Sequence, residues 1–542
     1  MKASKLLLLG IRFILLIALI SVLSGSALGA GDEDRPHLNS DIGKSAVLVI
    51  GAPFEDVGAE KDAGGVNVLY SSSGGFSTTA SQWFDQNTPG TPGSSEADDW
   101  FGFSLAGGDL NGDGYTDLVI GVPKEVVKAE VEAGGVDILY GSPAGLSTTG
   151  SQWFDQNTPG TPGSAEAYDW FGGALAAGDL NGDGYADLVV GVPSEDVLSV
   201  YDAGGVDVLY GSASGLSTIG CQWLDQNSPG IIGSAEIGDW FGGALAAGDL
   251  NGDGYDDLVV GVPHEDVGSA ITAGGVNVLY GSLNGLSTAG SQWFDQNTPG
   301  VSGTAETEDY FGNSLAVGDL NGDGYADLAI GVPQEGIDAV SEAGGMNVLY
   351  GSSSGLTTAG SQWFDQNTSG VIGSAEKYDH FGHSLAVGDL NGDGYADLAV
   401  GVLYESVGTI GNAGGVNVLY GSSSGLSTIG NQWFDQNHSG ISGSAETNDQ
   451  FGATLAVGDL NRDGYADLVV GVPHEGIDSV GDAGGVHVLY GSSSGLSTSG
   501  SLWFDQNTSG VIGSAEAGDG LGRALVILAV PEHIIYLPLV SR

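Results

Sequence analysis

The sequence is poor in cysteine and in basic residues: its 542 positions hold one cysteine, two methionines and only 12 lysines and arginines. Cys221 is the single cysteine, so a disulfide within the chain is excluded. Acidic residues number 68 and give a formal net charge of −56. A surface with this charge repels nucleic acid and anionic lipid. We therefore expect no nucleic-acid partner.

Residues typical of long helices are also scarce. Charged residues make up only 15% of the chain, whereas glycine occurs 97 times. Long helices favour Glu, Lys and Arg, and frequent glycine is typical of tight turns between short strands. The composition therefore predicts an all-β protein.

The first thirty residues have the pattern of a secretory signal. Lys2, Lys5 and Arg12 precede or interrupt an apolar run that ends near Leu23, and small residues follow at 24–30. The apolar run is long enough that a retained anchor is the alternative. No second run of spanning length follows. We expect residues 1–30 to be a cleaved signal peptide, no transmembrane segment after cleavage, and a secreted or cell-surface protein.

A unit of 70 residues recurs along the chain and contains four strand-like segments. Examples are Phe171–Ala177, Ala186–Pro193, Gly205–Tyr210 and Ser151–Gln156. Each is a short run of apolar, β-branched or aromatic residues between Gly, Pro, Asn and Ser, and nothing between them has the length and period of a helix. Each unit is therefore predicted to be a four-stranded antiparallel meander.

Seven such units predict a seven-bladed β-propeller, since stacked repeats must bury one another's apolar faces. Segment Ala46–Pro53 is a second strand without a first, and Leu521–Val530 is a first strand without a second. Joined, they would close the ring; an open solenoid would need polar capping repeats. We predict a linker at 31–45, the propeller at 46–530 and an apolar tail at 531–542.

An acidic loop, Asp-Leu-Asn-Gly-Asp-Gly-Tyr-x-Asp in its commonest form, occurs in six of the units. Side-chain oxygens at positions 1, 3, 5 and 9, a carbonyl at 7 and glycine at 6 suit a flexible Ca²⁺ site. The closing blade has Asn39, Asp41, Gly43 and Val47 instead, so we expect about six Ca²⁺ ions. The predicted ligands, with tyrosine contributing its carbonyl, are Asp109, Asn111, Asp113, Tyr115 and Asp117; Asp179, Asn181, Asp183, Tyr185 and Asp187; Asp249, Asn251, Asp253, Tyr255 and Asp257; Asp319, Asn321, Asp323, Tyr325 and Asp327; Asp389, Asn391, Asp393, Tyr395 and Asp397; and Asp459, Asn461, Asp463, Tyr465 and Asp467.

Two other interpretations of this loop are possible. A helical EF-hand needs a ligand at position 12, but that position is apolar in every copy, as at Ile120. Simple hairpin turns would explain the Asp-Gly and Asn-Gly pairs, but they would leave three carboxylates crowded without a cation. Position 4 is glycine except at Arg462, and we expect it to face outward and to accept any side chain.

The order of these segments resembles the FG-GAP repeats of the integrin α-subunit head. The residues that carry the resemblance include Phe101-Gly102, the loop 109–117 and Gly121–Pro123, and Leu403 replaces the proline once. The resemblance implies a calcium-binding propeller that acts as an extracellular adhesion or ligand-binding module. Propeller-based hydrolases such as phospholipases with similar repeats, and purely structural cell-surface proteins, are the alternatives.

Catalysis has little support in the sequence, because near-identical repeats offer no unique constellation of side chains. His380 and His383 break the repetition, but their spacing on a strand directs them to opposite faces. The tryptophans from Trp83 to Trp503 recur in every unit and are expected to pack the outer strands. We therefore expect no enzyme.

The loops between strands 2 and 3 and between successive units vary, whereas the calcium loops and the strand 3–4 turns hardly change. Functional residues gather on variable loops of rigid scaffolds, although relaxed constraint would give the same variation. We expect a monomer that binds an unidentified extracellular protein or glycan through the variable loops. Aromatic anchors there are Trp100, Tyr168, Trp170, Trp240, Tyr310 and Tyr378.

Overall fold

The structure is a computed structural model that describes residues 46–72 and 75–528, and these residues form 28 strands and no helix. The chain divides into two units, Met1–Ser40 and Asp41–Arg542, and every described residue belongs to the second. In this part of the chain there is no helix long and apolar enough to cross a membrane. The predicted signal peptide, linker and tail, and the substituted loop positions Asn39, Asp41 and Gly43, lie outside the described residues.

The strands form seven antiparallel sheets of four, which confirms the predicted all-β propeller. The first blade in chain order is completed by the last strand of the chain, β28. The blades are β28 (Ala524–Leu528), β1 (Val47–Ala52), β2 (Gly65–Ser72) and β3 (Gly75–Phe84); β4 (Leu105–Gly108), β5 (Asp117–Val122), β6 (Gly135–Tyr140) and β7 (Ser147–Phe154); β8 (Ala174–Gly178), β9 (Asp187–Val192), β10 (Gly205–Tyr210) and β11 (Ser217–Leu224); β12 (Ala244–Gly248), β13 (Asp257–Val262), β14 (Gly275–Tyr280) and β15 (Ser287–Phe294); β16 (Leu315–Gly318), β17 (Asp327–Val332), β18 (Gly345–Tyr350) and β19 (Thr357–Phe364); β20 (Phe381–Gly388), β21 (Asp397–Val402), β22 (Gly415–Tyr420) and β23 (Ser427–Phe434); and β24 (Thr454–Gly458), β25 (Asp467–Val472), β26 (Gly485–Tyr490) and β27 (Ser497–Phe504).

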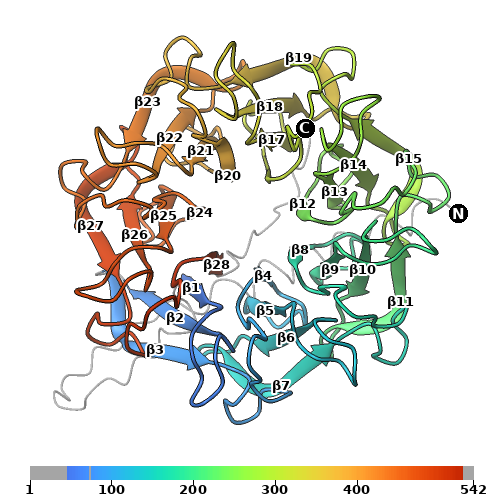
Figure 1. Ribbon diagram of the computed structural model, residues 1–542. Helices are drawn as coiled ribbons and strands as arrows, with labels where there is room; N and C mark the ends of the chain where they lie inside the picture. The colour runs from blue at the N-terminus through green and yellow to red at the C-terminus, as the bar shows by residue number, and fades with distance from the viewer. Residues whose placement is uncertain (1–45, 73–74, 529–542) are drawn as a thin grey trace, which may run out of the picture. The chain divides into compact units, whose positions relative to one another are not determined.

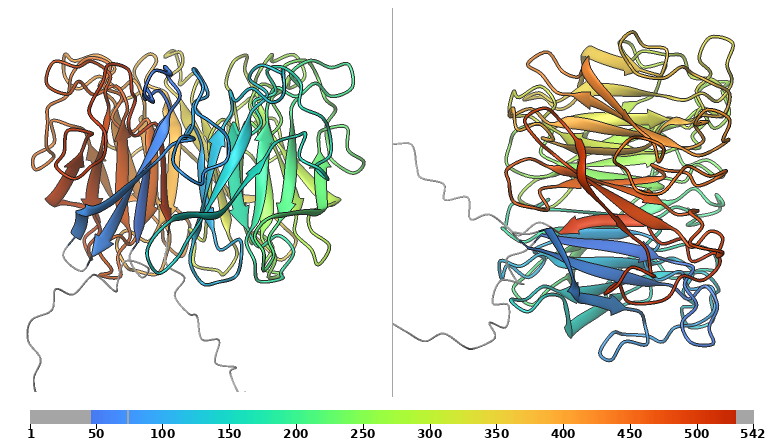
Figure 2. Two further views of the ribbon diagram at one scale, coloured as in Figure 1. Left: turned by 90° about the horizontal axis from the view of Figure 1, so that it is seen from below. Right: turned by 90° about the vertical axis from the view of Figure 1, so that its left-hand side faces the viewer.

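The seven sheets stand around a central axis with the first strand of each blade innermost (Figure 1). Each inner strand contacts the inner strand of the next blade, from β4 through β8, β12, β16, β20 and β24 to β28, and β28 contacts β4. The ring is therefore closed, and the strands run between two sets of loops at its two ends (Figure 2).

Closure occurs in the blade that both ends of the propeller share. Strand β1 pairs antiparallel with β28, with Val47 opposite Leu528 and Gly51 opposite Ala524. This pairing confirms the predicted joining of the two half-blades. It removes the free edges that an open ring would expose.

The core lies between neighbouring blades, not inside any one of them. The second strand is buried along its whole length in six blades, as in β9, and in β1 only Val47 is half-buried. Between the second and third blades, Val119 and Ile138 of one pack with Leu188 and Val190 of the next. Because each sheet buries its faces only against its neighbours, the repeat cannot be stable alone.

The recurring tryptophan packs across the outer pair of strands, as predicted. In the second blade, a Cβ placed on Gly135 would lie 2.0 Å from Cζ2 of Trp153. The indole therefore occupies the space that any larger residue at position 135 would need. Its Nε1 donates a hydrogen bond of 2.9 Å to Asp155 Oδ2.

Two predicted strand boundaries are wrong. The outer strand begins at Ser147, four residues before the predicted Ser151, because a bulge between Ile138 and Tyr140 lets the pairing continue. The inner strand β8 begins at Ala174, after the predicted Phe171. Phe171 is instead bonded to the preceding blade, since its N–H donates to Ala133 O at 3.0 Å. The Phe-Gly pair thus joins two blades.

Candidate calcium loops and loop face

The acidic loops fold their side-chain oxygens against their own backbone amides. In the first loop the Asp113 N–H donates to Asp109 Oδ1 at 3.1 Å and to Asn111 Oδ1 at 2.9 Å. The Tyr115 N–H donates to Asp113 Oδ1 at 3.0 Å. The loop at 179–187 repeats all three bonds. The ligands predicted at positions 1, 3 and 5 are thus brought together in one turn.

The aspartate at position 9 has a structural role as well. Both oxygens of Asp117 accept backbone hydrogen bonds, from Leu110 at 2.9 Å and from Gly141 at 2.8 Å. These bonds tie the acidic loop to the turn between β6 and β7. The pKa of Asp117 is raised to about 7, mainly by burial; repulsion from the charges of Asp109 and Asp113 also raises it, and the two N–H donors lower it. A bound cation would offset that repulsion.

Successive acidic loops are linked around the ring. The Ala186 N–H donates to the Asp109 carbonyl of the preceding blade at 2.9 Å. A Cβ on Gly112 would lie 2.5 Å from Cε1 of Tyr185, also in the next blade. Position 4 is exposed as expected, but a Cβ would meet a tyrosine ring there, so the expectation that it accepts any side chain is wrong for glycines 112, 182, 252, 322 and 392. Arg462 precedes the closing blade, which has no such loop in the described residues.

The donor set of each loop fits calcium chemically. Three Asp carboxylates, an Asn amide oxygen and a carbonyl are all hard oxygen ligands, which Ca²⁺ prefers. Within residues 46–72 and 75–528, no group of three or more His, Cys, Asp or Glu side chains is arranged to hold a metal ion. The calcium sites therefore stay a prediction.

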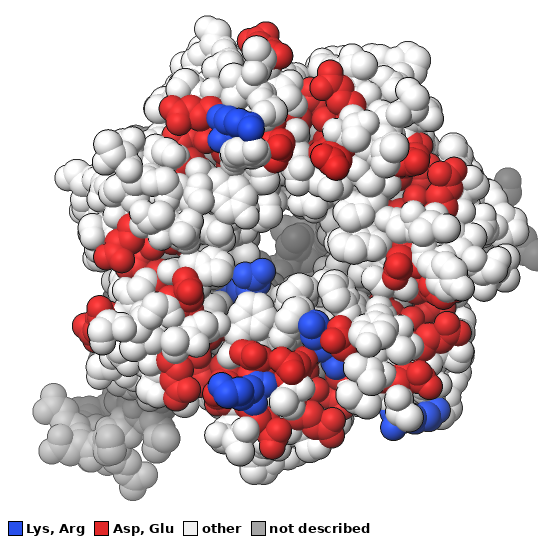
Figure 3. Space-filling view, in the orientation of Figure 1, with Lys and Arg blue, Asp and Glu red and all other residues white. Residues whose placement is uncertain are grey.

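The opposite end of the ring, which we call the loop face, consists of the strand 2–3 loops and the loops between blades. It faces the viewer in Figures 1 and 3, and its centre is hollowed. Tyr168 and Tyr378 are 57% and 46% exposed there. The other predicted anchors, Trp100, Trp170, Trp240 and Tyr310, are half-buried.

The half-buried aromatic residues of the loop face pack against other aromatic rings. Trp100 stacks on Phe103, with ring centroids 5.5 Å apart, and lies 6.5 Å from Trp170. Trp240 stacks on His264 at 4.2 Å, and His264 contacts Tyr310. Aromatic side chains at this repeat position are therefore mainly packed, and Tyr168 and Tyr378 are the anchors that remain available to a partner.

The backbone at this position is left-handed in every blade. Trp100, Trp170, Trp240 and Tyr310 have φ values of 62°, 59°, 60° and 59°. Bulky residues rarely adopt such angles. Their amides are held by the preceding blade, as by the bond from Trp170 N–H to Glu132 O. The strain is thus fixed by contacts between blades.

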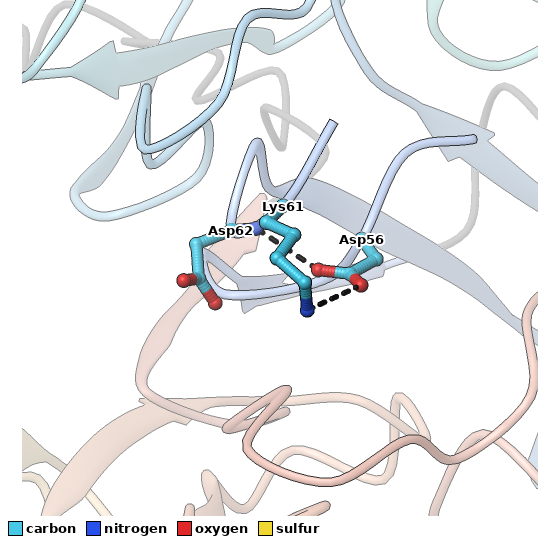
Figure 4. Close-up of polar contacts among 3 residues, drawn as sticks. All are labelled: Asp56, Lys61 and Asp62. Atoms are coloured by element: carbon cyan, nitrogen blue, oxygen red, sulfur yellow. Dashed lines mark hydrogen bonds and ion pairs between the residues drawn. The ribbon is translucent and has the colours of Figure 1, made fainter. Parts of the chain in front are cut away.

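The strand 2–3 loops are shaped by aspartates. In the closing blade Asp56 Oδ1 accepts the Asp62 N–H at 3.1 Å, and Asp56 Oδ2 pairs with Lys61 Nζ at 3.4 Å (Figure 4). The equivalent bond joins Asp202 N–H to Asp196. Asp62 has a φ of 50°. The acidic residues of this face therefore set its loop conformations as well as its charge.

A ring of buried and half-buried glutamates joins the blades below the loop face, and the sequence analysis did not predict it. Each glutamate accepts a hydrogen bond from a glutamine of the preceding blade at 2.5 to 2.7 Å. Their exact recurrence in all seven units was the available signal. The glutamates are Glu55, Glu125, Glu195, Glu265, Glu335, Glu405 and Glu475.

The two histidines that break the repetition do not form a metal pair. His380 Nε2 lies 3.7 Å from Glu342 Oε2, and its ring contacts Tyr404. His383 lines a separate pocket beside Arg523. Cys221 takes the place of a serine, since its Sγ lies 2.8 Å from Gly160 O where Ser151 Oγ contacts Gly90 O.

Comparison with known proteins shows similarity to integrin alpha proteins and to a phospholipase D. Integrin alpha pat-2 of Caenorhabditis briggsae is 33% identical over 285 residues, which is 47% of this chain and 20% of the relative. Integrin alpha-3 of Cricetulus griseus is 29% identical over 308 residues, 52% of this chain and 27% of the relative. Phosphatidylinositol-glycan-specific phospholipase D of Rattus norvegicus is 35% identical over 169 residues, 31% of this chain and 19% of the relative. The chain thus matches between 19% and 27% of the length of these relatives.

The FG-GAP repeat matches six segments of the chain, and each begins at a Phe-Gly pair that joins two blades. The segments are residues 101–145, 171–209, 241–278, 311–345, 381–419 and 451–489. Each contains one acidic loop. With six of these repeats in a closed ring of seven four-stranded blades, the chain is an FG-GAP repeat protein with an integrin α-like β-propeller.

Proposed function

We propose that this propeller is an extracellular, calcium-binding adhesion or ligand-binding module that binds a protein or glycan through its loop face. The observation that carries the proposal is the difference between the two ends of the ring. The calcium-loop end repeats almost unchanged, whereas the loop face differs from blade to blade and exposes Tyr168 and Tyr378. Specific partners need an asymmetric patch with aromatic anchors.

Calcium would act on the scaffold at the end opposite the partner. In the first loop, Asp109, Asn111, Asp113 and Asp117 side chains and the Tyr115 carbonyl would hold the ion. The ion supplies positive charge that offsets repulsion among the carboxylates. Asp117 would connect that effect to the β6–β7 turn through Gly141. The similarity to integrin alpha proteins and the signal-like pattern at 1–30 support the extracellular location.

The test is a pull-down or glycan array with the full chain, with and without a calcium chelator. Tyr168→Ala and Tyr378→Ala should weaken capture of any partner found. The matched control is Leu283→Ala, because Leu283 is 76% exposed on the strand 3–4 turn at the other end. Loss of capture only in the Leu283 variant would contradict the assignment of the binding face.

A hydrolase is the second candidate function. It is favoured by the similarity to phosphatidylinositol-glycan-specific phospholipase D and by a pocket that interrupts the seven-fold repetition. Release of a phosphatidylinositol-glycan-anchored reporter by the purified chain would establish it. Our proposal expects no release.

A further inference from the structure

The loop face has a pocket that spans three consecutive blades on one side of the ring. Its cavity volume is about 300 Å³. His383 comes from β20, Tyr404 and His474 follow β21 and β25, Gln450 precedes β24, and Arg523 precedes β28. The pocket therefore belongs to the second half of the chain, away from the run of tryptophans.

The repeat explains why the pocket occurs here. At one position of each unit stand Trp100, Trp170, Trp240, Tyr310 and His380, whose rings fill the space beside the next strand 2–3 loop, but Gln450 and Gly520 follow. Gln450, which lines the pocket, leaves room that the aromatic rings occupy in other blades. The pocket thus occurs where the aromatic ring present at this repeat position in most of the other blades is missing.

Arg523 is a cation without an anionic partner in the described residues. On the same face Lys61 pairs with Asp56 at 3.4 Å and Lys124 with Glu132 at 3.6 Å. The Arg523 guanidinium instead lies over the Phe54 ring, 5.1 Å from its centroid. Burial lowers the pKa of Arg523, so its charge is incompletely solvated. A partly buried guanidinium of this kind is stabilised by an incoming anion.

The charge of the lining is unusual for this protein. The chain has 68 acidic residues, and patches of Asp and Glu side chains recur around the loop face, where Lys and Arg are few (Figure 3). Nevertheless, no carboxylate is among the described residues that line the pocket. Asp482 lies outside the lining, and its Oδ1 is 3.3 Å from Nδ1 of the lining residue His474. A carboxylate ligand in this pocket would therefore not be repelled by a negatively charged lining residue.

The other polar residues of the pocket can form hydrogen bonds with a ligand that is bound to the Arg523 guanidinium. Burial lowers the pKa of His383 to about 4, aided by His380 and Arg523, so its ring is neutral and has one N–H to donate. Gln450 and Tyr404 add an amide and a hydroxyl. Arginine recognises carboxylates through two parallel N–H donors, and the aromatic rings of Tyr404 and His474 give apolar surface.

We propose that this pocket binds the carboxylate of a single acidic sugar. A volume of about 300 Å³ is at the small end of ligand sites and suits one sugar ring. Its mixture of hydrogen-bonding groups and rings matches sugar hydroxyls and C–H faces. A polyanionic chain is disfavoured, because the net charge of −56 would repel it. The inference rests on the proposed function in taking the loop face as the binding face, and it names a ligand class there.

The experiment is calorimetric titration of the calcium-loaded full chain with D-glucuronate and D-galacturonate, with D-glucose as the neutral control. At least one acid should bind saturably and at least tenfold more tightly than glucose. Arg523→Gln should lower that affinity at least tenfold, and Lys61→Gln should leave it unchanged. N-acetyl-aspartate tests the amino-acid source of the same carboxylate and should bind more weakly than the sugar acid.

A second variant keeps the test decisive if Arg523→Gln does not fold. Gln450→Trp restores the residue that three other blades carry at this position, so the fold accommodates it, and it should fill the pocket and abolish binding. Equal affinity for glucuronate and glucose, unchanged binding in both variants, or tighter binding of N-acetyl-aspartate would overturn the proposal. The two hypotheses can fail separately: saturable binding of the sugar acid by a calcium-loaded chain that captures no partner contradicts the proposed function alone.

Discussion

Gln156 Nε2 donates a hydrogen bond of 2.6 Å to Glu195 Oε2, and this bond joins the outer strand of one blade to the strand 2–3 loop of the next. Burial, followed by the charge of the nearby Asp169, raises the pKa of Glu195 to about 8. Because the equivalent glutamine and glutamate occur in all seven units, the ring contains seven carboxyl groups of this kind.

The first prediction is that the ring loses stability as pH rises from about 5 to 8. A glutamate in the unfolded chain releases its proton near 4.5, whereas folded Glu195 keeps it until about 8. The stabilisation is fully present below the lower value and is lost as pH rises through the higher one, at about 1.4 kcal/mol per pH unit for each such group. Thermal melting at saturating calcium should show the fall, and Glu195→Gln should reduce its slope. A melting temperature that rises over this range would contradict the prediction.

The second prediction concerns calcium. Chelation should lower the melting temperature of the chain, because six acidic loops would lose the cation that offsets their carboxylates. Asp183→Ala should remove one ion of about six, measured by calorimetric titration. Asp187→Ala should cost more stability than Asp183→Ala even in chelator, since both Asp187 oxygens accept backbone bonds, from Leu180 and Gly211. An unchanged melting temperature in excess chelator would argue against bound calcium.

The third prediction tests the packing of tryptophan over glycine. Gly135→Ala should destabilise the protein by about 1 to 3 kcal/mol, because the new Cβ would meet the Trp153 ring at 2.0 Å. Gly411→Ala is the matched control, since no atom lies within 4 Å of its Cβ position. Denaturant melts of both variants check the difference. Equal effects would show that the indole can move aside.

The fourth prediction exploits a buried position that differs among blades. Neither carboxyl oxygen of Asp137 has a hydrogen-bond partner in the described residues, and burial, followed by the charge of Glu125, raises its pKa well above its usual range. At the same repeat position Asn277 Nδ2 donates to Ile232 O at 2.8 Å. Asp137→Asn should therefore raise stability by about 1 kcal/mol at pH 7, and Asn277→Asp should lower it. Denaturant melts with the opposite order would refute the prediction.

The fold could be predicted almost completely because repetition multiplies weak local signals. One Gly205–Tyr210 segment is ambiguous by itself, but seven copies with constant spacing define strand order and blade number. Strand ends were less predictable. Phe171 has the pattern of a strand residue, but its N–H is bonded to Ala133 of the preceding blade, a contact that the sequence does not reveal.

The candidate site also has parts that the sequence predicts and parts that it does not. The acidic loops could be predicted from the sequence because all their expected ligands lie within nine consecutive residues, as from Asp109 to Asp117. The sequence shows that the glutamines and glutamates of the ring recur, but it does not show that they pair. Gln156 and Glu195 are 39 positions apart and meet between two blades.

The sequence by itself determined the seven-bladed ring, the closing of its last blade and the positions of its acidic loops, since each depends on local pattern and period. Only the tertiary structure decided which loop-face aromatics stay exposed, where Gly112 meets Tyr185, and how His383, Gln450 and Arg523 come to line one pocket. Those contacts form between neighbouring blades. Their side chains are about 70 residues apart, a separation at which no local pattern specifies which atoms touch.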